Sequence, residues 1–164
     1  MLLSAVLIED SKTIRDSLIP ALRDMASVQV IAVAETANDA AATLDGLCES
    51  WQLAVVDLFL REGSGLDVLR SIQRRLPHQR VAVLTNYPTS EMRERTMGLG
   101  ADVLFDKSTE LEQFFNWCNQ IRLVHPASGA AHRTTQLRLP SRPAPSFRAD
   151  AAFTHGPVQI NWYR

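Results

Sequence analysis

The feature that most constrains the fold of this chain is an alternation, repeated five times, of short apolar runs with longer segments of helical period. The apolar runs have the length of strands and lie at positions 4–8, 28–34, 53–56, 81–84 and 103–105. In the segments that follow them, apolar residues recur every three or four positions, which is typical of a helix with one buried face. These helices are expected at positions 11–25, 35–48, 66–76, 90–98 and 111–123.

Such an alternation requires a parallel sheet with right-handed crossovers and helices on both of its faces. The run at 53–56 is continuously apolar, as expected of a central strand that is covered on both sides. The pattern therefore predicts an α/β fold, namely a flavodoxin-like, doubly wound, five-stranded parallel sheet with the order 2-1-3-4-5. Pro20 falls inside the first expected helix, where we expect a local kink because the apolar stripe continues past it.

Charge is unevenly divided along the 164 residues. Residues 1–125 carry 12 Lys and Arg against 17 Asp and Glu, net −5, whereas residues 126–164 carry five Arg against one Asp, net +4. The second stretch also holds five of the eight prolines. We therefore expect a folded domain at 1–124 and a Pro- and Arg-containing tail at 125–164 that is disordered or loosely docked. The arginines of the tail are dispersed rather than clustered, so nucleic-acid binding is not expected.

Three features of the chain favour a cytoplasmic protein. No apolar run approaches the roughly 20 residues that a membrane-spanning helix needs. The first residues lack a basic segment and lead straight into acids, which favours a first strand over a signal peptide. The two cysteines, Cys48 and Cys118, are far apart and have no metal-ligand partners nearby. Both are therefore expected to behave as small apolar residues in a reducing compartment.

Polar residues of different chemistry follow four of the five apolar runs: Glu9 and Asp10, then Asp57, then Thr85, then Lys107. Because functional groups gather outside the carboxyl ends of the strands in an open parallel sheet, we expect these residues to share one crevice. Two adjacent acids close to a third carboxylate repel one another unless a cation lies among them. Hard oxygen ligands in a partly hydrated site suit Mg²⁺.

Each of these residues has a chemical role open to it. Asp57 is the candidate nucleophile, because a carboxylate can attack phosphorus and form an acyl phosphate. Thr85 can donate its hydroxyl to a phosphoryl oxygen, and Lys107 can pair first with the carboxylate and later with the phosphate. Taken singly, an acid is commonly a helix cap, and Thr85 and Lys107 are an ordinary strand-end hydroxyl and surface cation. Their joint placement at successive strand ends favours the functional interpretation.

In order and spacing, these residues resemble the site of a response-regulator receiver domain of two-component signalling, in the CheY-like superfamily. Two short motifs add to the resemblance: Gly65-Leu66 after the acceptor loop and Gly100-Ala101-Asp102 before the last strand. The resemblance extends from residue 3 to about residue 123. Residues 1–124 are therefore expected to form a receiver domain, and no output domain is recognisable after it.

The resemblance implies phosphotransfer to Asp57 from a phosphohistidine on a sensor histidine kinase or a phosphotransfer protein. It also implies that Glu9 or Asp10, together with Asp57 and the backbone carbonyl of Phe59, coordinates Mg²⁺. Thr85 and its neighbours would then move and signal to an unknown downstream protein. No enzymatic turnover is implied beyond self-catalysed phosphotransfer and slow autodephosphorylation. Homodimers are common among relatives and are a further expectation.

Choice of the cognate kinase and of the downstream target is expected to depend on surface residues of the first helix, namely Lys12, Thr13, Arg15 and Asp16, and on the region of the fourth helix. The chain also departs from the family pattern close to the expected site. Receivers usually carry Met-Pro where this chain has Leu60-Arg61, proline where it has Ser108, and a small residue where it has Asn86. Without the proline, the loop after Lys107 should be less constrained, and Asn86 should restrict access of the phosphoryl group.

The aromatic switch position of the family is occupied by Leu104. Phe105 lies beside it, but alternation along a strand sends its side chain to the opposite face. Tyr87, two residues after Thr85, is the candidate substitute for a reporter on the surface. The expected switch residues are therefore Thr85, Tyr87 and Leu104.

Three other functions remain open at this point. The departures just described are compatible with a degenerate receiver that is regulated by partner binding without phosphorylation. A phosphatase with Asp57 as nucleophile is less favoured, since such enzymes need a second acid two residues later, where Phe59 stands. A flavin-binding module on the same fold is disfavoured, because Glu9 and Asp10 would repel the phosphate of FMN.

Overall fold

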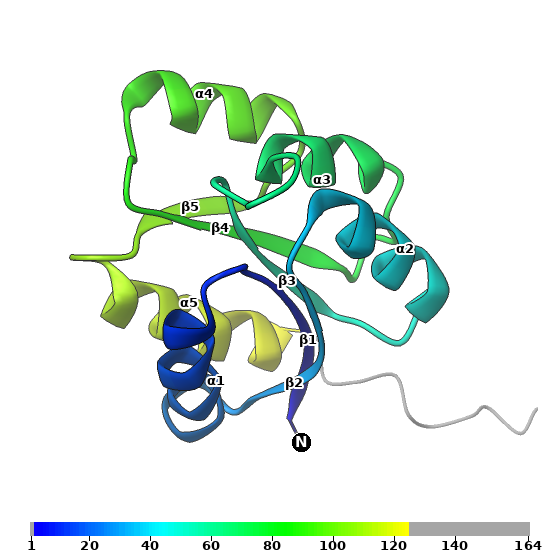
Figure 1. Ribbon diagram of the computed structural model, residues 1–164. Coiled ribbons are helices and arrows are strands. Elements are labelled where there is room, and N and C mark those ends of the chain that lie inside the picture. The colour runs from blue at the N-terminus through cyan, green and yellow to red at the C-terminus, as the bar shows by residue number, and fades with distance from the viewer. Residues whose placement is uncertain (1, 125–164) are drawn as a thin grey trace, which may run out of the picture. The chain divides into compact units, whose positions relative to one another are not determined.

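The computed structural model describes residues 2–124, and the statements below concern that range; the expected tail lies outside the described residues. Five strands and five helices alternate along the chain, as Figure 1 shows. The strands are β1 (Leu3–Ile8), β2 (Val28–Ala34), β3 (Leu53–Asp57), β4 (Arg80–Thr85) and β5 (Val103–Asp106). The helices are α1 (Lys12–Ala26), α2 (Ala37–Leu47), α3 (Gly65–Ser71), α4 (Ser90–Gly98) and α5 (Leu111–Val124).

All five strands run parallel in the order β2-β1-β3-β4-β5. Helices α1 and α5 cover one face of the sheet, and α2, α3 and α4 cover the other (Figure 1). The predicted fold class, strand order and two-sided layering are thereby confirmed. Helix α1 continues through Pro20, as the apolar stripe predicted.

The predicted third helix was too long, because α3 ends at Ser71 rather than near residue 76. After this point the backbone changes to bonds between residues three apart, with the N–H of Ile72 donating to Leu69 and that of Arg75 donating to Ile72. The N–H of Leu76 then donates to the side chain of Gln79 instead of continuing a helix. Ile72 and Leu76 continue the apolar spacing of the helix, but the backbone hydrogen bonds of an α-helix end at Ser71, so the spacing alone predicted too long a helix.

Two hydrophobic cores hold the layers together, one on each face of the sheet. Along β3 every residue is buried, with Ala54 and Val56 facing α2, α3 and α4 while Leu53 and Val55 face α1 and α5. This alternation is the two-residue period of a strand with both faces covered. It confirms β3 as the central strand and places Asp57, its last residue, at the middle of the carboxyl edge.

The two cysteines differ in their surroundings. Cys118 is buried in the core beneath α1 and α5, as expected of a small apolar residue. Cys48 is exposed, so that expectation was wrong for it. It is the C-cap residue of α2, and its thiol donates to the carbonyl oxygen of Asp45 on the surface.

A β-bulge in β2 changes which face of the sheet its side chains meet. Ala5 pairs with Val30 and Val6 pairs with Ala32, so Ile31 is left over between them. Val30 therefore belongs to the core under α1 and α5, whereas Ala32 belongs to the core under α2 and α3. Simple alternation would have placed both on one face.

Four of the helices begin with a hydroxyl N-cap immediately after a strand-end loop. Ser11, Thr36, Ser64 and Thr89 each accept a hydrogen bond from the N–H three residues later. Such caps satisfy one of the free first-turn donors and hold the loop to its helix. Ser11 is the N-cap of α1, so the carboxylate of the adjacent Asp10 is not needed for capping and is available for other contacts.

Candidate functional site

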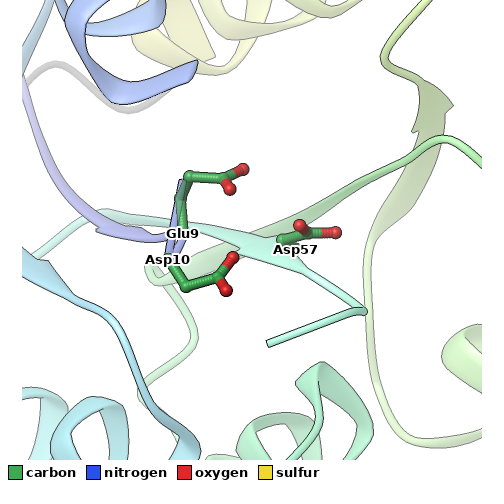
Figure 2. Close-up of side chains that lie close together, drawn as sticks. All are labelled: Glu9, Asp10 and Asp57. Carbon is green, nitrogen blue, oxygen red and sulfur yellow. The ribbon is translucent and has the colours of Figure 1, made fainter. Parts of the chain in front are cut away.

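The carboxyl edge of the sheet brings three acids together from two strands. Figure 2 shows Glu9 and Asp10 after β1 and Asp57 at the end of β3, with the side chains of Glu9 and Asp10 extending toward the side on which Asp57 lies. One oxygen from each lies within 4.8 Å of the others. The predicted convergence of these three side chains is thus what the structure shows.

Lys107 joins this group from the loop after β5. Its Nζ donates to Glu9 Oε2 at 2.6 Å and lies 2.8 Å from Asp57 Oδ2. The backbone N–H of Lys107 also donates to the carbonyl of Thr85, so the loops after β4 and β5 are tied together. Lys107 is therefore not an ordinary surface cation; it balances carboxylates that are costly to bury unpaired.

The three acids have different surroundings. Glu9 is almost fully buried, and its other oxygen accepts the N–H of Ser11 at 3.0 Å. Asp57 is largely buried and accepts the N–H of Phe59 at 3.3 Å. Asp10 is partly exposed. Three carboxylates and one ammonium leave an excess of negative charge among closely spaced, hard oxygen atoms. This donor set fits Mg²⁺.

The loop after Asp57 folds back so tightly that α3 must begin with glycine. A Cβ on Gly65 would overlap the carbonyl oxygen of Asp57 and lie 2.8 Å from the Cα of Leu58. The N–H of Gly65 donates to the carbonyl of Leu58 at 3.1 Å. The Gly65-Leu66 motif noted in the sequence therefore has a steric reason, which is close backbone approach rather than a special backbone angle.

An aromatic bridge, which we define as the side chains of Phe59 and Tyr87, spans the loops after β3 and β4. The two rings meet edge to face with centroids 5.1 Å apart, and both are more than half exposed. Their N–H groups donate to the carboxylate of Asp57 and to the hydroxyl of the fully buried Thr85, respectively. This contact was not predicted from the sequence. Its only signal was that each ring lies two residues after a strand-end polar residue.

The side chain at position 104 is buried inside the fold. Leu104 is buried in the core under α4, and its carbonyl accepts a hydrogen bond from Arg93 at 2.8 Å. Phe105 points to the other face, where it packs against Phe114 and Trp117. The predicted opposition of residues 104 and 105 is confirmed.

Two of the residues that depart from the family pattern contact each other. The hydroxyl of Ser108 donates to Asn86 Oδ1 at 3.4 Å, which is a long hydrogen bond between exposed side chains. Arg15 also departs from expectation. It was expected on the recognition surface with Lys12 and Asp16, which are exposed and paired, yet its side chain is largely buried against the loop after β1. The expected exposure was therefore wrong for Arg15.

Comparison with known proteins decides the family. A family profile described as the response regulator receiver domain matches residues 5–118. The chain belongs to this receiver-domain family. No match to a curated protein was found at the sequence level. Receiver domains bind Mg²⁺ in an acidic pocket and interact with histidine kinases or phosphotransfer proteins, and Glu9, Asp10 and Asp57 form such an acidic cluster here.

Solved structures of receiver domains share this fold. A DNA-binding response regulator of the LuxR family from Staphylococcus aureus aligns with TM-score 0.65 and 18% identity, covering 73% of this chain and 98% of that one. The receiver domain of a DNA-binding response regulator from Colwellia psychrerythraea 34H gives 0.64 and 24%, covering 75% and 98%. The response regulator domain of CheB from Thermotoga maritima gives 0.63 and 16%, covering 77% and 98%. Receiver domains are generally not true enzymes. Within residues 2–124, no helix is long and apolar enough to cross a membrane.

Proposed function

We propose that this receiver domain accepts a phosphoryl group on Asp57 from a phosphohistidine of a sensor histidine kinase or phosphotransfer protein. In the transfer, a carboxylate oxygen of Asp57 attacks phosphorus, the P–N bond to the imidazole breaks, and the ring nitrogen keeps the electron pair. The observation that carries this proposal is the bridging of Glu9 and Asp57 by Lys107, beside the partly exposed Asp10. It combines a nucleophile, a mobile cation and a set of oxygen ligands at one strand edge.

Each side chain of the site has a defined part in this proposal. Asp10 and Asp57, with the backbone carbonyl of Phe59, hold Mg²⁺, and Glu9 orients the site from its buried position. When bound, Mg²⁺ offsets the repulsion between the Asp57 carboxylate and the incoming phosphoryl group. Lys107 keeps its bond to Glu9 and turns its remaining donors from Asp57 to a phosphoryl oxygen.

The signal is proposed to leave through Thr85 and the aromatic bridge. The hydroxyl of Thr85, which accepts the N–H of Tyr87, turns to donate to the phosphoryl group. Asp57 changes at the same time, so both N–H anchors of the bridge are altered together. Because Leu104 is aliphatic and buried, Tyr87 and Phe59 supply the surface change that an aromatic residue at 104 gives in relatives.

The test uses acetyl phosphate with and without Mg²⁺, followed by intact-mass measurement. Wild type is expected to gain the mass of one phosphoryl group only when Mg²⁺ is present. Asp57→Asn should gain none, whereas Asp16→Asn, a matched change at an exposed aspartate of α1, should behave as wild type. A phosphoryl group on Asp57→Asn, or none on wild type, would refute the assignment.

A second candidate is a degenerate receiver that signals by binding alone. It is favoured by the contact between Asn86 and Ser108, two residues that differ from the family pattern beside Thr85 and Lys107. Wild type that neither binds Mg²⁺ nor accepts phosphate would support it. Phosphatase activity is not supported, because the position of the required second acid holds the exposed ring of Phe59. Steady turnover of a phosphomonoester would be needed to revive that idea.

A further inference from the structure

Arg15 makes three hydrogen bonds around the acidic pair, although it is itself no part of the pair. Its Nη1 donates to the carbonyl oxygens of Glu9 at 2.8 Å and Asp10 at 2.9 Å. Its Nη2 donates to Glu35 Oε1 at 2.7 Å, and only 14% of its side chain is exposed. One guanidinium thus binds the backbone on the carboxyl side of both acids.

These carbonyls lie where the sheet no longer supplies donors. The last β1–β2 hydrogen bond runs from the N–H of Glu9 to Ala34, and α1 begins at Lys12. A carbonyl at such a turn needs another donor if it is shielded from water. The planar guanidinium presents several donors in fixed directions, so a single arginine satisfies both carbonyls and a carboxylate.

Glu35 extends this contact to two further loops. It follows β2, and its second oxygen lies 3.2 Å from the guanidinium of Arg61 in the loop between β3 and α3. The loops after β1, β2 and β3 are therefore linked through Arg15, Glu35 and Arg61. In this row of three linked side chains, Arg61 is mostly exposed and lies at the outer end, whereas Arg15 lies at the inner end, next to Glu9 and Asp10.

We propose that Arg15 is a positioning residue for the metal ligands. By holding the carbonyls of residues 9 and 10, it fixes the directions in which the side chains of Glu9 and Asp10 leave the backbone, and with them the placement of the oxygens offered to a divalent cation. This inference rests on the proposed function, since it assumes that Mg²⁺ binds at the acidic cluster. It assigns Arg15 to the site rather than to kinase recognition.

The effect of removing Arg15 on Mg²⁺ affinity distinguishes a positioning role from a purely electrostatic one. The guanidinium is a cation close to a cation site, so its removal would strengthen Mg²⁺ binding if charge alone mattered. If Arg15 orients the ligands, its removal weakens Mg²⁺ binding, because loss of a residue that orients metal ligands generally lowers metal affinity. Arg15→Lys separates the two views further. It keeps the charge but loses the fork that reaches both carbonyls and Glu35.

The experiment measures the Mg²⁺ dissociation constant of full-length Arg15→Gln, Arg15→Lys and wild type by titration calorimetry. Both variants are expected to bind Mg²⁺ about tenfold more weakly. Arg61→Gln is the matched control, because it removes the outer arginine and leaves the Arg15 contacts in place; its affinity should equal that of wild type. Tighter or unchanged binding by Arg15→Gln, or wild-type binding by Arg15→Lys, overturns the inference.

A metal-free measurement separates this inference from the proposed function. The N–H of Ser11 donates to Glu9 Oε1, so its hydrogen exchange reports the geometry of the loop without any ion. Relative to the amides of β3, exchange at Ser11 should be about tenfold faster in both Arg15 variants. Unchanged exchange at Ser11 overturns the inference. If exchange at Ser11 is accelerated in the variants but wild type binds no Mg²⁺, the proposed function and the metal role are overturned, while the positioning of the loop after β1 by Arg15 is supported.

Discussion

Two charged clusters lie at opposite edges of the same sheet, and they combine acidic and basic side chains differently. At the carboxyl edge, Lys107 is the one cation among residues 2–124 that pairs with Glu9 and Asp57, and Asp10 lies nearby. At the amino edge, before β5, Asp102 faces two arginines. The partners of Asp102 are Arg75 at 2.8 Å, Arg80 at 3.3 Å and the N–H of Val81 at 2.7 Å.

The difference separates the cluster that is proposed to react, which we call the reactive cluster, from a structural one. Both carboxylate oxygens of Asp102 are paired with arginines, and one of them also accepts a backbone N–H, so this acid is satisfied by its protein partners. At the carboxyl edge the acids outnumber the ammonium, and one acid is partly exposed to incoming groups. An under-neutralised crevice can take up a cation and a phosphoryl group, whereas a satisfied cluster holds two strand starts together.

The largest effect is expected when Lys107, the cation that pairs with both Glu9 and Asp57, is removed. Lys107→Met leaves two nearly buried carboxylates unpaired and is expected to lower the free energy of unfolding by about 3–5 kcal/mol. Mg²⁺ should restore part of that loss, because it replaces the missing positive charge. Urea denaturation with and without Mg²⁺ measures both effects. Lys12→Met, at an exposed pair, should change stability by less than about 1 kcal/mol.

A substitution in the structural cluster around Asp102 should change only the stability of the fold. Asp102→Asn keeps the shape of the side chain but removes its charge from two arginines, and we expect a loss of about 2 kcal/mol in urea denaturation. The rate of phosphorylation by acetyl phosphate should stay at the wild-type value in folded protein. A slower phosphorylation would mean that the two edges are coupled and that the contrast drawn above is wrong.

The backbone beneath the reactive cluster offers a smaller, steric test. Gly65→Ala places a methyl group against the carbonyl of Asp57 and should cost about 1–3 kcal/mol while slowing phosphorylation. Gly46→Ala is the matched control, because nothing lies within 4 Å of its Cβ position in α2. It should stabilise the protein by up to about 1 kcal/mol. Equal effects of the two substitutions in thermal unfolding would contradict the proposed close approach at residue 65.

The last prediction concerns the buried thiol of Cys118 and applies only at alkaline pH. Burial raises the pKa of the Cys118 thiol to about 12. The unfolded chain loses this proton near pH 8.5. Because the folded state then binds more protons than the unfolded state, stability is expected to fall as the pH rises from about 8.5 toward 12. Cys118→Ala should flatten that slope in urea denaturation, while at pH 8 a thiol reagent should label the exposed Cys48 alone in folded protein.

Much of the site could be predicted because the rules that place it are local and periodic. A strand of alternating or continuous apolar residues ends where the polar residues begin, and parallel strands end at one edge. This is why Glu9, Asp57 and Lys107 could be assigned to one cluster from their positions alone. The same rule also places Asp102, at the other end of a strand, outside the crevice.

The contacts that sequence reasoning missed are made by long side chains across loops. Arg15 fits the exposed positions of an amphipathic helix, yet its guanidinium reaches back to carbonyls of the preceding turn. Phe59 and Tyr87 come from different loops and meet only because both strands end side by side. No periodic pattern records either contact, since both depend on side-chain reach.

By itself, the sequence determined the alternation of strands and helices, the order of the sheet and the edge at which the acids gather. These follow from hydrophobic period and from the handedness of parallel crossovers, which act along the chain. Only the tertiary structure decided that Ser11 rather than Asp10 caps α1, that β2 changes face at Ile31 and that Arg15 turns inward. Those choices depend on which donors and acceptors lie within reach once the layers have packed, and that is a property of three-dimensional distance.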